Sequence, residues 1–217
     1  MIVIYHHNDL DGRSAASLIY NMYKDQPFAK FKFIEVDYNT RDLNADDVED
    51  CAKVFILDYS LSEKGNLMEF CRILDKAESV FWIDHHKTSI ELEKSDPETY
   101  HQIKGIRLDG YSGALLTWYW LQYKTENSEY DETLEASDIE KRLPHCPRWI
   151  RLIDDWDTFK CKLASREFKL GVEIYDTSPT SDIWYNLLTK IYSENQFIDK
   201  GDLIVRYENQ VNSKFCT

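Results

Sequence analysis

Three short segments of the sequence combine aspartates and histidines in patterns that suit divalent cations. They are Tyr5–Gly12 (YHHNDLDG), Asp58 and Asp84–His86 (DHH). Carboxylate oxygens and neutral imidazoles bind hard or borderline cations such as manganese, magnesium and iron. Taken alone, the acids are equally typical of side chains that cap a following helix. Together, the three segments indicate a metal site if the fold brings them to one place.

The elements that must position these segments are short strands. The apolar runs Ile2–Tyr5, Val54–Leu57 and Val80–Ile83 each lead directly into one of the three segments. Stretches with helical spacing of apolar residues, 13–24 and 62–76, lie between them. Short apolar strands that alternate with helices predict a parallel sheet. Because ligands bind at the carboxyl ends of such strands, the three segments should share one edge.

We therefore predict an α/β fold, with a parallel sheet of about five strands flanked by helices and a mostly helical C-terminal part. We expect one domain over residues 1–190 and a C-terminal helix over 191–217. Residues 125–138 are polar and acidic and predict a loop. The remaining expected elements are two strands, 31–36 and 103–108, and five helices, 112–124, 148–155, 162–175, 180–195 and 196–212.

The charge of the chain argues against a general nucleic-acid-binding surface. It has 39 acidic and 26 basic residues and a formal net charge of -13. Duplex DNA is therefore not an expected partner, because its binding relies on basic side chains that neutralise phosphates. The acidity favours solubility, and a site that gathers carboxylates also carries negative charge until cations fill it.

The cysteines and the hydropathy predict a cytoplasmic protein with no membrane contact. There are five cysteines, an odd number, and no pair has the C-x-x-C spacing. This argues against a disulfide framework and a thiolate zinc site, and we expect most of them to be buried. We find no secretory signal and no run of about 18 apolar residues that would span a membrane.

The order and spacing of the motifs resemble the DHH family of phosphoesterases over roughly the first 160 residues. The matching segments are His7–Gly12, Asp58, Asp84–His86 and Asp109–Ala114, the last being a small-residue segment that begins a helix. The family includes RecJ-like single-strand exonucleases, oligoribonucleases, cyclic-di-AMP phosphodiesterases and family II inorganic pyrophosphatases. The resemblance implies the α/β DHH domain and a phosphoesterase activity.

The resemblance also implies two divalent metal ions, with manganese expected and magnesium or iron as alternatives. By position in the motifs, His7 and Asp9 would hold one ion. Asp11 and His85 would hold the other, and Asp58 would bridge both. A fourth motif of the family supplies one more aspartate to the second ion.

The candidate stretch for the fourth-motif aspartate is Asp154-Asp155-Trp156-Asp157. We favour Asp155 over Asp157 and Asp154.

The catalytic residues implied by the resemblance are His86 and Asp84. His86 would contact the substrate phosphate, with Arg13 and Lys87 as further contacts, and Asp84 would orient an imidazole from behind. His6, which precedes the motif histidine, is expected to be a structural residue of the first strand.

Two neighbouring cations can share one water, lower its pKa and neutralise phosphate oxygens. The expected reaction is hydrolysis of a phosphate ester, with short oligonucleotides or nucleotide phosphates as the leading substrates. One alternative is an exopolyphosphatase or pyrophosphatase. Another is a metal-binding regulatory or nucleotide-sensing module without turnover, and the last is a protein whose acids only cap helices.

Most members of the family carry a second, smaller domain with a glycine-rich segment. The present chain has 7 glycines and no such segment, and Gly201–Asn212 resembles the connector that leads to that domain. A homo-oligomer that completes the cleft is therefore one alternative. A set of aromatic residues offers base stacking, although core packing is the more common role; it comprises Trp118, Tyr119, Trp120, Trp149, Trp156 and Trp184.

Overall fold

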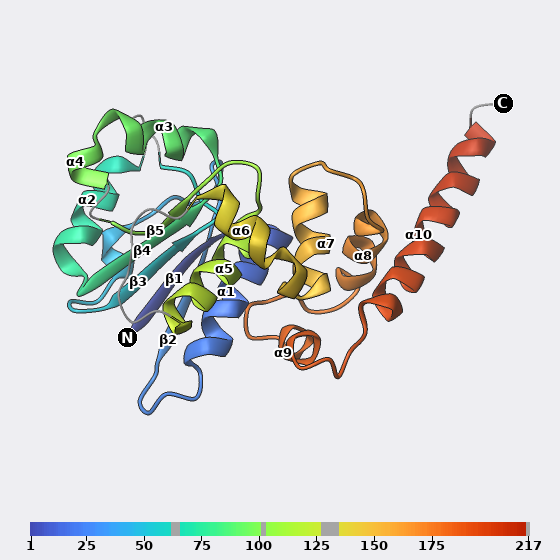
Figure 1. Ribbon diagram of the computed structural model, residues 1–217, viewed down its shortest axis with the longest axis horizontal. Coiled ribbons are helices and arrows are strands. Elements are labelled where there is room, and N and C mark those ends of the chain that lie inside the picture. The colour runs from blue at the N-terminus through green and yellow to red at the C-terminus, as the bar shows by residue number, and fades with distance from the viewer. Residues whose placement is uncertain (62–65, 101–102, 127–134, 216–217) are drawn as a thin grey trace.

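The computed structural model describes residues 1–61, 66–100, 103–126 and 135–215. Its centre is a five-stranded sheet in which every neighbouring pair is parallel, in the order β2-β1-β3-β4-β5 (Figure 1). The strands are β1 (Ile2–His7), β2 (Phe31–Val36), β3 (Lys53–Leu57), β4 (Ser79–Asp84) and β5 (Lys104–Arg107). The predicted parallel sheet of about five strands is confirmed.

Helices lie on both faces of the sheet, and the later ones gather at one end of it (Figure 1). Up to residue 126 the described helices are α1 (Leu10–Tyr23), η1 (Ala45–Asp47), α2 (Leu67–Lys76), α3 (Lys87–Ser95), α4 (Pro97–Tyr100) and α5 (Gly113–Glu126). The helical C-terminal part contains α6 (Ala136–Arg142), η2 (Leu143–His145), α7 (Arg148–Asp157), α8 (Ser165–Val172), α9 (Asp182–Leu188) and α10 (Glu194–Phe215). This confirms the flanking helices and the mostly helical C-terminal part.

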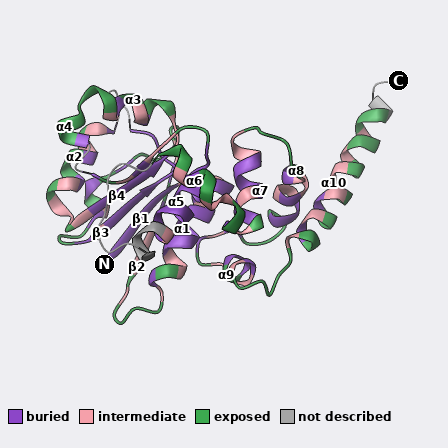
Figure 2. Ribbon diagram, in the orientation of Figure 1, coloured by how far each residue is buried: buried purple, intermediate pink, exposed green. Residues whose placement is uncertain are grey.

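The central strands β1, β3 and β4 are buried on both faces, which explains why they are continuous apolar runs in the sequence (Figure 2). The edge strands β2 and β5 are partly exposed and carry polar residues among the apolar ones. Successive side chains point to opposite faces of a strand. In β1, Ile2 and Ile4 join the core beneath α1 and α5, whereas Val3 and Tyr5 join the core beneath α2. The sheet is thus a rigid platform held between two apolar layers.

The strand order reverses at β1, with β2 on one side of it and β3 on the other. The helix after β1, α1, packs in the core of one face, while α2, which follows β3, packs in the core of the opposite face. The loops that leave these two strands therefore diverge and leave a crevice at the carboxyl edge. Ligand sites in open parallel sheets form at such a switch point.

Several helices differ from the sequence prediction. The helices α3, α4 and α6 were not expected, and α6 begins inside the stretch predicted as a loop. The expected helices 180–195 and 196–212 are α9 and α10, with a break where Lys190 adopts a positive φ of 59°. The predicted start of α2 and part of the predicted loop fall on 62–65 and 127–134, outside the described residues.

The expectation that most cysteines are buried is wrong. Cys146 is buried, whereas Cys51, Cys71 and Cys161 are exposed, and all four are free thiols. Cys216 lies outside the described residues. Within the part of the chain that the structure describes, no helix has the length and apolar character needed to cross a bilayer.

The helix α10 packs against α8 through its N-terminal half, and Glu208 further along it forms an ion pair of 2.7 Å with Arg166 of α8. The C-terminal end of α10 extends away from the rest of the molecule (Figure 1). Two glycines allow the close approach. A Cβ at Gly171 would lie 1.8 Å from the carbonyl oxygen of Phe197, and one at Gly201 would lie 1.8 Å from that of Glu167. The division into residues 1–190 and 191–217 stays a prediction.

We expect Gly201→Val to separate α10 from α8, because its side chain has no room at this contact. Overpacking of this kind costs about 1–3 kcal/mol. Limited proteolysis should then cleave the chain near the start of α10, while the larger fragment keeps its circular dichroism.

Asn209→Val, at an exposed position of the same helix, is the matched control and should leave the cleavage rate unchanged. Equal protease resistance of the Gly201→Val and wild-type chains would contradict the prediction.

Candidate metal centre

The three motifs meet at the carboxyl edge of the sheet, as their positions after β1, β3 and β4 predict. Their ligand atoms form three groups, and within each group these atoms lie within 4.8 Å of one another. The groups are His7–Asp9–Asp58, Asp58–His85–His86 and Asp11–His85–Asp157. Asp58 and His85 each belong to two groups, so the side chains form one continuous cluster.

The last residue of β1 and the loop that follows it contribute His7 and Asp9. The Nδ1 atom of His7 lies 2.6 Å from Oδ2 of Asp9, while Oδ1 of Asp9 accepts a hydrogen bond of 2.8 Å from the amide of Gly12 and caps α1. The same carboxylate thus caps a helix with one oxygen and faces the cluster with the other. Helix capping and metal binding are therefore compatible at this position.

Asp58 lies at the centre of the cluster. It follows β3 with a positive φ of 53°, a left-handed conformation that aspartate tolerates better than most residues, and it is 1% exposed. Its Oδ1 lies 3.1 Å from Nε2 of His85, and its Oδ2 lies 3.8 Å from Nδ1 of His7. The carboxylate thus points one oxygen toward each side of the cluster.

The N-terminus of α5 supports the buried carboxylate of Asp11. The amides of Gly113 and Ala114 donate hydrogen bonds of 2.6 Å and 2.8 Å to its two oxygens. A Cβ at Gly113 would lie 2.7 Å from the Cβ of Asp58, so only glycine allows this approach. The positive end of the helix dipole stabilises the negative charge there.

Asp84 and His86 form a second, adjoining pair. Asp84 is fully buried at the end of β4, and its Oδ1 lies 2.7 Å from Nδ1 of His86. The hydroxyl of Ser89 donates a hydrogen bond to the other oxygen of Asp84. This arrangement fixes the orientation of the His86 ring and leaves its Nε2 available.

The fourth-motif aspartate that reaches the cluster is Asp157, whereas the sequence favoured Asp155. Oδ2 of Asp157 lies 3.5 Å from Nε2 of His85, and Asp157 forms a group with His85 and Asp11. Asp155 instead accepts hydrogen bonds from the hydroxyl of Ser165 at 2.7 Å and from two backbone amides after α7. Residues two apart on a helix point about 200° away from each other, so one helix cannot direct both toward the sheet.

Asp154 is also engaged elsewhere. It accepts hydrogen bonds from the amide of Ser112 at 2.8 Å and from Nζ of Lys160 at 2.7 Å. It therefore joins α7 to the loop before α5 rather than to the cluster.

The two predicted basic contacts lie outside the cluster. The guanidinium of Arg13 donates to Glu35 at 2.8 Å, to Asn8 at 2.7 Å and to Thr177 at 3.4 Å. A phosphate contact through Arg13 would have to replace one of these interactions. The side chain of Lys87 is 79% exposed at the start of α3, with Nζ 3.9 Å from Asp109.

His6 is fully buried in β1, and its Nδ1 lies 3.0 Å from the carbonyl oxygen of His7. Burial lowers the pKa of its imidazole. None of the three groups of ligand atoms includes it.

Burial of several acids together dominates the electrostatics. Desolvation raises the pKa of Asp11 and of Asp58 well above the ordinary value, and the charges of neighbouring aspartates raise it further. Burial and the charge of Asp9 raise the pKa of Asp157 to about 7. Without cations, these carboxyl groups therefore resist full ionisation near neutral pH.

The histidines divide into two kinds. The hydrogen bond to Asp9 raises the pKa of His7. Burial lowers the pKa of His86, but its hydrogen bond and ion pair with Asp84 outweigh this and raise the pKa overall. Burial, followed by the charge of His86, lowers the pKa of His85, which favours the neutral imidazole that a metal requires.

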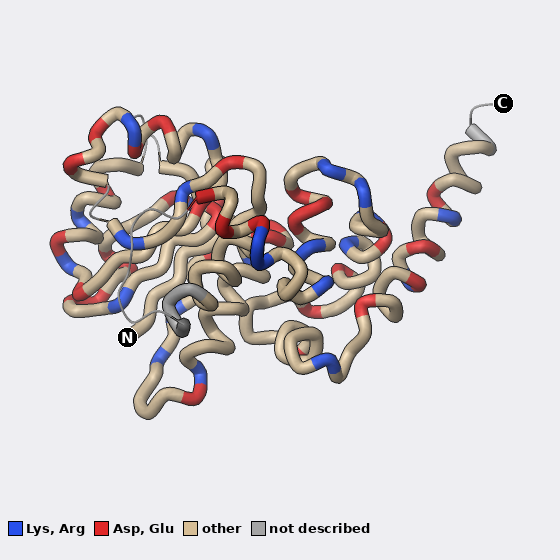
Figure 3. The backbone as a smooth tube through the Cα atoms, viewed as in Figure 1, with Lys and Arg blue, Asp and Glu red and all other residues tan. Residues whose placement is uncertain are grey.

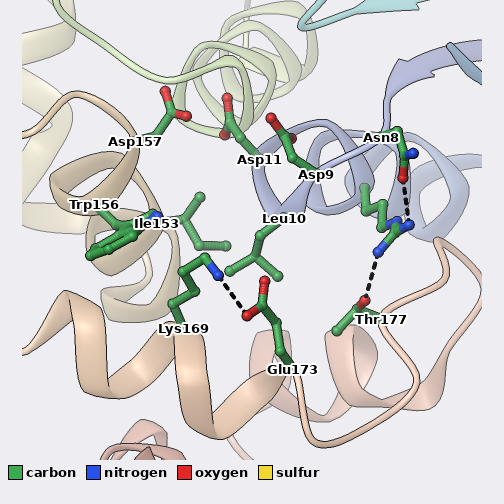
Figure 4. A pocket seen from close by; sticks show the side chains of 11 residues that line it. Asn8, Asp9, Leu10, Asp11, Ile153, Trp156, Asp157, Lys169, Glu173 and Thr177 are labelled. Atoms are coloured by element: carbon green, nitrogen blue, oxygen red, sulfur yellow. Dashed lines mark hydrogen bonds and ion pairs between the residues drawn. The ribbon is translucent and has the colours of Figure 1, made fainter. Parts of the chain in front are cut away.

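A cavity of about 230 Å³ adjoins the cluster (Figure 4). Asp9, Asp11 and Asp157 line one rim, and the ion pair of Lys169 with Glu173 lies on the opposite rim. Leu10, Ile153 and Trp156 form its apolar floor. The hydrogen-bonded set of Asn8, Arg13 and Thr177 lines the rest of the wall. Figure 3 shows acidic positions gathered where the sheet meets the helical part.

The donor set fits divalent cations. Among the residues that the structure describes, no hydrogen-bond donor reaches the buried Oδ2 of Asp58 or of Asp157. Buried carboxylate oxygens without donors are costly unless a charge compensates them. Oxygen ligands from four aspartates and nitrogen ligands from two histidines match the preferences of manganese, magnesium or iron.

Two residues next to the cluster were not identified from the sequence. Ser89 donates a hydrogen bond to Asp84. In the sequence, only its position as a small polar residue just after the third motif could have indicated this role. Tyr38 lies near His7 and His86. It has no sequence signal, because the loop after β2 reaches the cluster only in the folded chain.

The fold and the cluster define an α/β protein with a candidate divalent-metal centre at the carboxyl edge of a parallel sheet. The sequence profile described as DHH family, N-terminal domain, matches residues 1–143, which is more than half of the chain. The chain therefore belongs to the DHH family, and the resemblance seen in the motifs is confirmed.

A comparison with solved structures found a similar fold in the crystal structure of an uncharacterized protein from Helicobacter pylori G27. The TM-score is 0.53 at 13% sequence identity, a level that shows the fold alone. The similarity covers 95% of this chain, which spans 62% of the other protein. The comparison with curated proteins found no match.

We expect the metal-free protein to lose thermal stability as pH rises, partly through Asp157. The pKa of Asp157 is about 7 in the folded chain, against 3.8 for an ordinary aspartate, so folding favours the protonated carboxyl group. That stability is complete below pH 3.8 and is lost as pH rises through 7. In chelator, the melting temperature should therefore fall less between pH 5 and 8 for Asp157→Asn than for the wild-type chain.

Asp75→Asn, an exposed position on α2, provides the control and should follow the wild-type curve. A pH dependence of Asp157→Asn as steep as that of the wild type would refute the prediction.

Proposed function

We propose that this protein is a two-metal phosphoesterase that acts as a phosphodiesterase or nuclease on short oligonucleotides or nucleotide phosphates. The observation that carries the proposal is the position of Asp58. One of its oxygens faces His85 and the other faces His7, so a single buried carboxylate adjoins two sets of ligands. A shared carboxylate of this kind suits two neighbouring cations.

The first cation would be held by His7, Asp9 and Asp58. The second would be held by Asp11, His85 and Asp157, with Asp58 shared. Bound divalent cations supply an activated water and neutralise the charge on the phosphate. The raised pKa values of Asp11, Asp58 and Asp157 support this assignment, because cations would replace the protons that these carboxyl groups otherwise retain.

His86 would bind the phosphate through Nε2. Asp84 holds Nδ1 of His86, and the charge of Asp84 favours the protonated imidazole, which donates a hydrogen bond to an anionic oxygen. Lys87 would add a second positive charge from the start of α3, where its side chain faces solvent. A fixed donor aimed at the phosphate lowers the barrier because it needs no rearrangement during the reaction.

We expect purified protein reconstituted with manganese to hold about two ions per chain. Asp157→Asn should weaken the second site selectively, since this side chain faces the ligands Asp11 and His85. Elemental analysis after desalting, together with isothermal titration, measures both quantities. Stoichiometric loss of one ion in Asp157→Asn, with both retained in Asp155→Asn, would distinguish the two aspartates.

The opposite pattern would instead favour Asp155 as the ligand. A metal content near zero in both the variants and the wild-type chain would contradict a metal centre of any kind.

We expect Asp58→Asn and His85→Ala to lower manganese-dependent hydrolysis by about 100-fold or more, since even residues that only support a metal ligand contribute about 10–100-fold. The assay is a substrate screen with phosphoadenosine phosphate, short RNA, cyclic dinucleotides and polyphosphate. His145→Ala, an exposed histidine outside the cluster, is the matched control and should retain full activity.

Hydrolysis of polyphosphate alone would favour the exopolyphosphatase alternative, and tight nucleotide binding without turnover would favour a sensor. Full activity of Asp58→Asn would reject the proposed site.

A further inference from the structure

An exposed aromatic ring stands beside the cluster. Tyr38 is 54% exposed, and the centroid of its ring lies 5.7 Å from that of His7 and 6.3 Å from that of His86. These two imidazoles belong to different groups of ligand atoms. Tyr38 is therefore next to the position where a substrate phosphate would bind.

The ring is held in place although it faces solvent. It stacks on Tyr59 with centroids 4.8 Å apart and planes 12° from parallel. The amide of Ser60 donates a hydrogen bond of 3.0 Å to the hydroxyl oxygen of Tyr38. Tyr59 is itself buried, and its hydroxyl donates to Asp42 at 3.0 Å. The ring of Tyr38 is thus fixed from one face and from its polar end.

The backbone that carries Tyr38 is also fixed. The side chain of Asp37 accepts hydrogen bonds from the amides of Asn39 at 2.6 Å and Thr40 at 3.0 Å. The amide of Asp37 donates to the carbonyl oxygen of Arg41 at 2.8 Å and closes the turn. Because both backbone and ring are ordered in advance, contact with a ligand requires little further loss of conformational entropy.

The aromatic residues that the sequence suggested for stacking are mainly in the core. Trp118, Tyr119, Trp120, Trp149 and Trp184 are buried. Trp156 is half-buried at the wall of the cavity, with Nζ of Lys169 5.7 Å from its ring centroid. Tyr38 differs from all of these because it combines large exposure, rigid support and contact with two site histidines.

We propose that Tyr38 is the platform on which a nucleobase of the substrate stacks. This inference rests on the proposed function and narrows it, because it assigns the site to nucleotides or short oligonucleotides rather than to polyphosphate. One face of the ring is covered by Tyr59, so an incoming base uses the remaining solvent-facing surface. Stacking on an aromatic side chain accepts any base, since every base has a π face.

The test compares two ligands that differ only in the base, adenosine monophosphate and ribose 5-phosphate. Their dissociation constants are measured by isothermal titration with the manganese-loaded wild-type chain and with Tyr38→Leu. The wild type should bind the nucleotide about tenfold more tightly than the sugar phosphate. In Tyr38→Leu this ratio should fall to about one, whereas Tyr38→Phe, which keeps the ring, should largely retain it.

Tyr207→Leu, at an exposed tyrosine of α10, is the matched control and should keep the wild-type ratio. Circular dichroism confirms that each variant is folded. Equal affinity of the wild type for the two ligands, no binding of the nucleotide, or an unchanged ratio in Tyr38→Leu overturns the inference.

Failure of the proposed function would give different results from failure of the stacking inference. If Tyr38 stacks bases but the cluster is not a metal site, the ratio persists while Asp58→Asn leaves the affinity for both ligands and the hydrolysis unaltered. If the cluster hydrolyses only polyphosphate, Asp58→Asn abolishes that activity and the ratio in the wild type is about one.

Discussion

The constraint on which this structure depends is the burial of several carboxyl groups at one point. Asp11 and Asp58 are almost completely buried, and Asp157 adjoins them. Desolvation and mutual repulsion raise the pKa of all three. Such a site requires protons or cations to compensate its charge. The amides at the start of α5 compensate part of the charge on Asp11, but no donor among the described residues reaches Oδ2 of Asp58.

The rest of the fold maintains this unfavourable arrangement. The reversal of strand order at β1 opens the crevice, and two apolar cores hold the sheet rigidly beneath it. Gly113 lets α5 approach the cluster, and the left-handed backbone of Asp58 turns its carboxylate into the centre. Strain and buried charge of this kind concentrate at functional sites because surrounding packing can support them. The cluster is therefore a property of the whole domain and not of its loops alone.

Two features lie beside the cluster of aspartates and histidines. On one side, Tyr38 and Tyr59 form a supported aromatic pair beside the histidines. On another, the cavity carries an apolar floor and the ion pair of Lys169 with Glu173. Under the proposed function, cations held by the carboxylates would act on any phosphate ester and would contribute little to substrate choice. Substrate selectivity would then come from the aromatic and apolar surfaces next to the charged centre.

The sequence by itself determined the sheet, its parallel strands and the meeting of three motifs at one edge. Apolar runs specify buried strands, and parallel strands place their carboxyl ends together. Only the tertiary structure decided that Asp157 faces the cluster while Asp155 orders the segment after α7, since helix spacing does not reveal which side of α7 meets the sheet. It also decided that Arg13 binds Glu35, Asn8 and Thr177. Finally, it brought Tyr38 to His7 and His86, because such contacts depend on how distant segments pack and not on local pattern.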